Sequence, residues 1–209
     1  MFDTDTHAFY PTDGIHLFMG HYHRLTQSDD EYIAQPVLYV IHPEFRISQQ
    51  SPAPVHDIAL VKLARPVPLS RSIGIACLPE PTDELPDGIL AYTAGWGHTS
   101  TDSMLTDEPR KARIRVSPHS CRQLMINSTM HLCGRNERGN NICSGDSGTG
   151  LMVRAGVDSP SFNGTAWKWH LFGVASFGLD PCLQGVNLEN AFAMVSTDVD
   201  WIRNTISKY

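Results

Sequence analysis

Residues 140–151 read NNICSGDSGTGL and place a serine, Ser147, between an aspartate and a glycine. A serine hydroxyl is a weak nucleophile unless a neighbouring base accepts its proton. The glycines allow a sharp backbone turn, so the amides of Gly145 and Ser147 can point at one spot and form an oxyanion hole. Taken alone, the motif fits a surface turn as well as a nucleophile, and the rest of the chain has to decide between the two.

Three further motifs lie elsewhere in the chain. In HDIALVKL (56–63), Asp57 directly precedes the apolar part of the stretch, where a buried carboxylate can orient a histidine. AGWG (94–97) holds a tryptophan between two glycines, and ASFG (175–178) ends an apolar stretch with an open edge. Along the chain the four motifs occur in the order Asp57, AGWG, the serine loop and ASFG.

The chain reads as short β-strands separated by turns rich in Pro, Gly, Asp and Ser. The expected strands span residues 15–22, 34–41, 58–63, 89–96, 111–117, 150–154, 168–177 and 191–196. No helices alternate with them, which predicts an antiparallel all-β fold, a barrel or a sandwich. The exception is a helix over 198–209, where Val199, Ile202 and Ile206 recur at helical spacing and Asp198 is expected to cap the start.

Composition and charge exclude several classes of partner. The 209 residues are 41% hydrophobic and 18% charged, which is ordinary for a folded globular protein. The net charge of −6, without a long basic run, argues against nucleic acid as a partner. No apolar stretch approaches the length needed to cross a membrane.

Cysteines and glycosylation sequons indicate an oxidising, secretory environment. There are five cysteines, and sequons begin at Asn127 and Asn163. An odd number of cysteines predicts a free thiol or a partner outside the chain. Residues 1–14 lack the basic and apolar segments of a signal peptide. We therefore expect a secreted protein whose true N-terminus, signal peptide included, precedes this chain.

In type and order, these motifs resemble those of the chymotrypsin/trypsin family of serine peptidases, from about Ile15 to Ile206. The resemblance implies two six-stranded antiparallel β-barrels, the N-terminal one incomplete here, with the active site between them and a short C-terminal helix. The expected divisions of this one peptidase domain are an incomplete N-terminal barrel over 1–76, a linker over 77–88, a C-terminal barrel over 89–197 and the helix over 198–209. The implied reaction is cleavage of protein or peptide substrates through an acyl-enzyme.

The resemblance also assigns roles at the reacting centre. It implies that Ser147 is the nucleophile and that Asp57 is the acid that orients the histidine. It implies an oxyanion hole from the amides of Gly145 and Ser147. Asp146 matches the residue that pairs with a newly cut N-terminal ammonium in activated members.

Further residues match the part of the family that holds substrate. The edge that pairs with substrate backbone corresponds to Ser176, Phe177 and Gly178, with Phe177 in place of the more usual Trp. Asn141 lies two residues before Cys143, where trypsin-like members carry Asp, and Asn190 stands where a pocket glycine is usual. An asparagine cannot neutralise a buried Lys or Arg, so we expect no strong preference for basic residues. The alternative is that Asn141 is a loop residue without substrate contact.

The family's disulfides map onto most of the cysteines. The resemblance implies the bridges Cys121–Cys133 and Cys143–Cys182. A further bridge of the family is absent as a pair, because Ala91 and Val153 occupy its two positions. The family counterpart of Cys77 often bonds to a cysteine upstream of the catalytic domain, so Cys77 is expected to be unpaired within this chain.

The catalytic histidine of the family lies in a T-A-A-H-C-like motif, and we assign none of the ten histidines to it. His7 follows Asp-Thr and precedes no cysteine, and His42 precedes a proline as a non-catalytic family feature. His56 directly precedes the orienting aspartate, so on a strand it would point to the opposite face. Because residues 15–20 match the strand after the histidine loop, we expect the histidine to lie before Met1 and residues 1–209 to be inactive alone.

No metal or other cofactor is expected. The pattern His21-x-His23 could suggest a metal site, but a surface hairpin explains it and no third ligand is apparent. The family's calcium loop carries a glutamate ligand where His21 stands here.

A non-catalytic serine protease homologue is the alternative to a peptidase. Such a secreted protein would bind or regulate a partner without cleaving it. The residue at the histidine position decides between the two functions.

Overall fold

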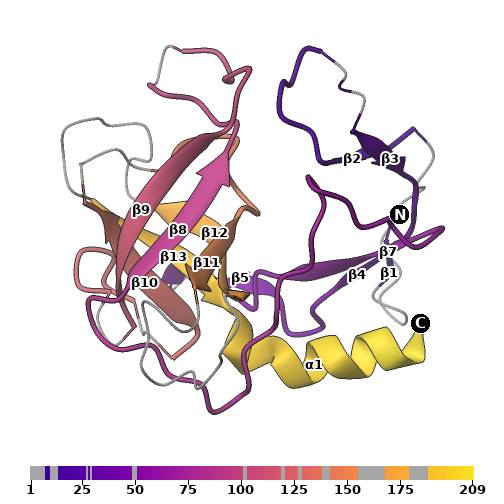
Figure 1. Cartoon of the computed structure of the whole chain (residues 1–209). Helices are drawn as coiled ribbons and strands as arrows, with labels where there is room; N and C mark the ends of the chain where they lie inside the picture. The colour runs from indigo at the N-terminus through magenta and orange to yellow at the C-terminus, as the bar shows by residue number, and fades with distance from the viewer. Residues whose placement is uncertain are drawn as a thin grey trace.

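The structure is a computed structural model that describes residues 8–9, 14–26, 28, 30–48, 51–100, 103–118, 121–126, 129–137, 142–154, 168–178 and 188–209. Its C-terminal half is a closed antiparallel barrel of six strands (Figure 1). These are β8 (Leu90–Gly95), β9 (Arg110–Ser117), β10 (His131–Asn136), β11 (Gly150–Arg154), β12 (Trp169–Gly178) and β13 (Glu189–Met194). Their order around the barrel is β10-β13-β12-β11-β8-β9.

The barrel core forms because alternate side chains along each strand point inward. On β11, Leu151 and Val153 are fully buried, whereas their neighbours are only half-buried. Phe172 of β12 and Phe192 of β13 fill the same apolar cluster. Ala91 and Val153, which stand at the positions of the absent family bridge, both belong to this cluster, so apolar packing occupies the place of the bridge.

The N-terminal half consists of smaller sheets. β1 (Ala8–Phe9), β4 (Pro36–Ile41) and β7 (Ala59–Leu63) form a three-stranded sheet in the order β1-β4-β7. β2 (Leu17–Met19) pairs with β3 (Tyr32–Ala34), and β5 (Arg46–Ser48) pairs with β6 (Ser51–Val55). Among the described residues these strands do not close a barrel. The predicted fold class, an all-β protein with an incomplete N-terminal barrel, is confirmed.

Helix α1 (Val195–Lys208) begins three residues before the predicted start. Its N-cap is Met194, which makes no side-chain capping bond, so the prediction that Asp198 caps the helix is wrong. Asp198 lies instead in the first turn, with 3% of its surface exposed. From the barrel, α1 runs along the N-terminal sheet (Figure 1), where Lys62 of β7 donates a hydrogen bond to the carbonyl of Tyr209. The helix therefore connects the two halves.

Five of the observed strands are not predicted from the sequence, namely β1, β3, β5, β6 and β10. Four of them have only two to five residues, too few to show an alternating pattern. β6 also contains two prolines, which argue against a strand unless it lies at an edge. β10 reads HLCGRN and is almost wholly buried, so it carries no alternation of polar and apolar residues either.

The disulfide prediction is confirmed for Cys121–Cys133, whose Cα atoms lie 5.3 Å apart. Cys143 is also disulfide-bonded, but Cys182 lies outside the described residues, so their pairing stays a prediction. Cys77 is a free, half-buried thiol at the start of the predicted linker. Within the part of the chain that the structure describes, no helix combines the length and apolar character needed to cross a bilayer.

Candidate active site

The loop that carries Ser147 follows the C-terminal barrel strand β10 and leads into β11. Gly145 has φ 90° and Gly148 has φ 84°, both in the left-handed region that L-residues rarely adopt. One such turn lies on each side of Ser147, which is exposed at the surface of the loop. The glycines of the G-D-S-G motif are therefore required by the backbone path.

Asp146 holds this loop against the AGWG motif. Its carboxylate accepts hydrogen bonds from the amide of Gly97 at 2.8 Å and from the amide of Cys143 at 3.1 Å. A Cβ at Gly95 or Gly97 would overlap the same carboxylate, which explains why glycine stands on both sides of Trp96. Motifs about fifty residues apart in the sequence thus form one unit around a single acidic side chain.

Asp57 lies between β6 and β7 and is half-buried. Its Oδ2 accepts a hydrogen bond from the hydroxyl of Ser176 at 2.6 Å. The pairing of β12 with β13 shifts register between Ala175 and Phe177, and such a bulge re-aims the side chain of the extra residue. The resemblance places Ser176 at the substrate edge only; its contact with Asp57 is not predicted, because no local pattern relates residues so distant in the chain.

Asp57 and Ser147 line the same cleft of about 630 Å³, together with Ser176 and with Ile41 at the end of β4. A second pocket of about 230 Å³ adjoins it and shares Ser147 and Ser176. The structure therefore brings together an exposed serine, a hydrogen-bonded carboxylate and a pocket able to take a side chain. No histidine is found among the described residues that line either cavity.

The second pocket is lined by the residues expected to hold substrate. Its lining includes Ser176, Phe177, Gly178 and Asn190. Asn190 is buried, with 3% of its surface exposed, and its amide donates to the carbonyl of Leu188 at 3.5 Å. Asn190 thus occupies space in the pocket that a glycine would leave free. Asn141, together with the sequon residues Asn127 and Asn163, lies outside the described residues.

His56 does not lie on a strand, contrary to the expectation from the sequence. Its φ of 50° places it in the left-handed region, and the amide of Ile58 bonds back to its carbonyl at 2.8 Å. The His56 ring therefore turns away from the cleft to meet Asp198 of α1 at 2.6 Å. His21 is likewise engaged elsewhere, at 2.6 Å from the carboxylate of Glu31.

One group of three side chains among the described residues could hold a metal ion, namely His42, His56 and Asp198. It involves neither Ser147 nor the second pocket. Burial lowers the pKa of His42 below its usual value, although the carboxylate of Asp198 pulls that pKa in the opposite direction. No pattern in the sequence relates these three residues, which come from three distant segments.

Comparison with known proteins agrees with this geometry. The family model described as trypsin matches residues 4–202. The CLIP domain-containing serine protease B4 of Anopheles gambiae is 29% identical over 194 residues, which cover 86% of this chain and 50% of that protein. The phenoloxidase-activating factor 3 of Holotrichia diomphalia is 31% identical over 172 residues, covering 79% of this chain and 45% of the relative. The chain therefore spans about half the length of these curated relatives.

Proposed function

Because the chain belongs to the trypsin family of serine proteases, we propose that it forms the peptidase domain of an endopeptidase that cleaves protein substrates. The observation that carries this proposal is the shared cleft of Ser147 and Asp57, next to a pocket of side-chain size. A turn with no function would not need a hydrogen-bonded, half-buried carboxylate and an open pocket beside its serine.

In the proposed reaction, the hydroxyl of Ser147 attacks the carbonyl carbon of the scissile bond while a histidine accepts its proton. Asp57 holds that histidine in the required tautomer and stabilises its charged form. The amides of Gly145 and Ser147 donate to the oxygen that becomes negative. The protonated histidine then donates its proton to the leaving amine. Water attacks the acyl-enzyme in the same way, with the histidine as base, and releases the acyl group from Ser147.

Asp146 is the proposed switch of the oxyanion loop. Its carboxylate now accepts from the amides of Gly97 and Cys143, close to the proposed oxyanion donors. A new N-terminal ammonium, made by cleavage of a precursor, would form an ion pair with this carboxylate. The ion pair would change the conformation of the loop, because the Asp146 carboxylate cannot keep both of its present hydrogen bonds unchanged.

The base has two possible sources. The first is a histidine before Met1, as the sequence predicts. His7, which lies outside the described residues, is the second candidate. The family match begins three residues before it, and Thr4 and His7 have the spacing of T-A-A-H, with Ala8 in place of the cysteine. Ala8 pairs with Val40, the neighbour of Ile41 in the cleft, and this placement favours His7.

Asp57→Asn tests the proposed reaction. In triads of this family, asparagine at the orienting position lowers kcat by about 10⁴-fold, because the histidine is held in the wrong tautomer. We expect the same loss for hydrolysis of a peptide ester by the full-length protein after its activation. Ser176→Ala, which removes only a hydrogen bond to Asp57, is expected to cost much less.

Asp200→Asn provides the matched control, since it removes an exposed carboxylate of α1 that lines neither cavity. Equal activity of Asp57→Asn and Asp200→Asn would contradict the role of Asp57. A full-length protein that binds substrate peptides without any hydrolysis would instead support the non-catalytic homologue, a secreted binding protein.

We propose a pocket for uncharged side chains, on the basis of Asn141 and of the buried Asn190. Asn190→Gly is expected to raise kcat/KM about tenfold or more for substrates with a large apolar residue before the scissile bond. Substrates with alanine there should change little, because they do not reach the added space. Measuring kcat/KM for both substrates checks this prediction, and an equal change for both would refute it.

Secretion is the proposed localisation. The Cys121–Cys133 disulfide supports it, because structural disulfides persist in oxidising compartments. The sequons at Asn127 and Asn163 are the proposed glycosylation sites. The free thiol of Cys77 is proposed to bond to a cysteine in a segment upstream of this domain.

A further inference from the structure

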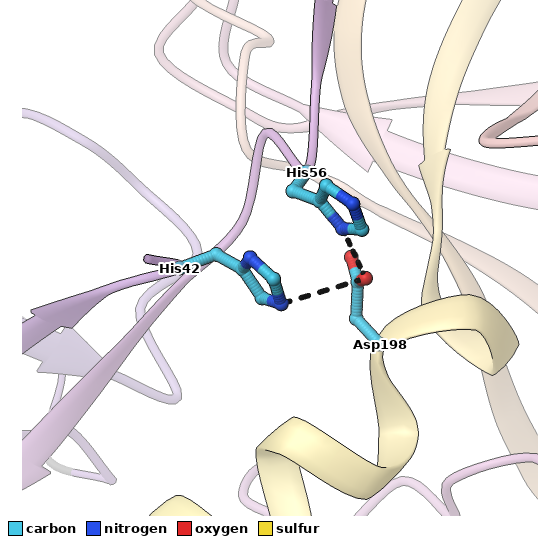
Figure 2. Close-up of side chains that lie close together, drawn as sticks. All are labelled: His42, His56 and Asp198. Atoms are coloured by element: carbon cyan, nitrogen blue, oxygen red, sulfur yellow. Dashed lines mark hydrogen bonds and ion pairs between the residues drawn. The ribbon is translucent and has the colours of Figure 1, made fainter. Parts of the chain in front are cut away.

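Two imidazoles and a carboxylate meet where α1 packs against the N-terminal half (Figure 2). His42 follows β4, His56 follows β6, and Asp198 lies in the first turn of α1. One carboxylate oxygen of Asp198 lies 2.6 Å from Nδ1 of His56 and 3.7 Å from Nε2 of His42. The three side chains are at most 9% exposed, so water cannot screen their interactions.

The backbone at this cluster is strained. His56 has φ 50°, which a residue with a Cβ rarely adopts. Strained backbone persists where surrounding contacts hold it, and it concentrates at functional sites. Here the contacts are the hydrogen bond with Asp198 and the stacking of the His56 ring on His42, with centroids 4.3 Å apart.

The donor set is one that zinc uses in proteins, namely imidazole nitrogens and a carboxylate oxygen. Donor atoms about 2.0 Å from a tetrahedral zinc lie ~3.3 Å from one another. The two measured separations to Asp198, 2.6 Å and 3.7 Å, fall on either side of that value. Movements of the donor atoms by well under one ångström therefore bring both pairs to the separation that a shared zinc ion requires.

We propose that His42, His56 and Asp198 form a zinc-binding site, with the fourth ligand position open to water. The sequence predicts no metal site, because the pattern of His21 and His23 shows no third ligand and His21 replaces the glutamate of the calcium loop; the ligands proposed here come from three distant segments. Zinc binding is inferred from these three side chains and does not rest on the proposed peptidase reaction. His56 directly precedes Asp57, so a bound ion would restrain the backbone that presents Asp57 to the cleft.

Binding requires a defined rearrangement. The two rings stack within 6° of parallel, so one ring has to turn before both nitrogen lone pairs can point at one ion. The ion replaces the hydrogen bond between Nδ1 of His56 and Asp198, so the neutral His56 ring has to carry its proton on Nε2. His42 has to carry its remaining proton on Nδ1, so the 3.2 Å hydrogen bond from the amide of Glu44 opens. The Glu44 carboxylate, 4.0 Å from Nε2 of His56, can then accept from that ring as an outer partner.

Calorimetric titration of Zn²⁺ into the full chain tests the proposal. Because a ring has to turn, we expect one site with a micromolar rather than a nanomolar Kd. His56→Ala and Asp198→Asn are each expected to weaken binding by more than the roughly 10–100-fold caused by loss of an outer partner. Ca²⁺, which prefers oxygen ligands, is expected not to compete.

His23→Ala is the matched control, because Nδ1 of His23 lies 3.6–3.7 Å from two carboxylates at an exposed surface. Binding lost in His23→Ala but kept in His56→Ala overturns the proposal, as does the absence of micromolar binding. If the variants fail to fold, NMR of the ring nitrogens in the unmutated chain replaces them. Zinc should then shift the ring nitrogens of His42 and His56, and shifts confined to other histidines overturn the site.

Discussion

Ser147→Ala is expected to lower kcat for a peptide ester by about 10⁶-fold in the activated full-length protein, as loss of the nucleophile does in serine proteases. The physical reason is that no acyl-enzyme can form, so only binding and oxyanion stabilisation remain. The same substitution should abolish covalent labelling by a fluorophosphonate. Both are measured on the full-length protein and on residues 1–209 in parallel.

Ser144→Ala provides a close control for this experiment. Ser144 is exposed in the same loop and lines the second pocket, but it has no assigned part in the reaction. We expect kcat to remain near that of the unmutated protein. If fluorophosphonate labelling persists in Ser147→Ala and disappears in Ser144→Ala, the nucleophile is Ser144, and the assignment of Ser147 is wrong.

His7→Ala decides where the base comes from. If His7 is the base, kcat should fall about as far as in Ser147→Ala, because the two residues act as a unit. For the same reason, the double variant should lose no more than either single variant. Hydrolysis of the same peptide ester by the three variants of the full-length protein provides the measurement.

His16→Ala is the control for this second prediction, since His16 is an exposed histidine before β2 that lines neither cavity. If His7→Ala behaves like His16→Ala, with kcat nearly unchanged, the base lies outside residues 1–209. That outcome also agrees with an inactive chain 1–209, as expected from the sequence. Activity of residues 1–209 that depends on both Ser147 and His7 would reject that expectation.

Much of the fold could be predicted from the sequence because its signals are local. Apolar stretches such as 150–154 alternate with the period of a strand, and the structure places β11 over the same residues. The strands that were missed are very short, contain proline or are buried on both faces, so their sequences carry no such period. The start of α1 was misplaced because Asp198 looked like a cap but serves as a buried partner of His56.

For the candidate site, the sequence by itself determined the types of group present: the serine between glycines, the aspartate before an apolar strand and the tryptophan between glycines. Only the tertiary structure decided which groups meet. It joined Asp57 to Ser176, Asp146 to Gly97, and His56 to both His42 and Asp198. The physical reason is that local patterns reflect backbone geometry within a few residues. These contacts instead depend on how strands far apart in the chain pair and pack, which brings residues 119 and 142 positions apart into hydrogen-bond distance.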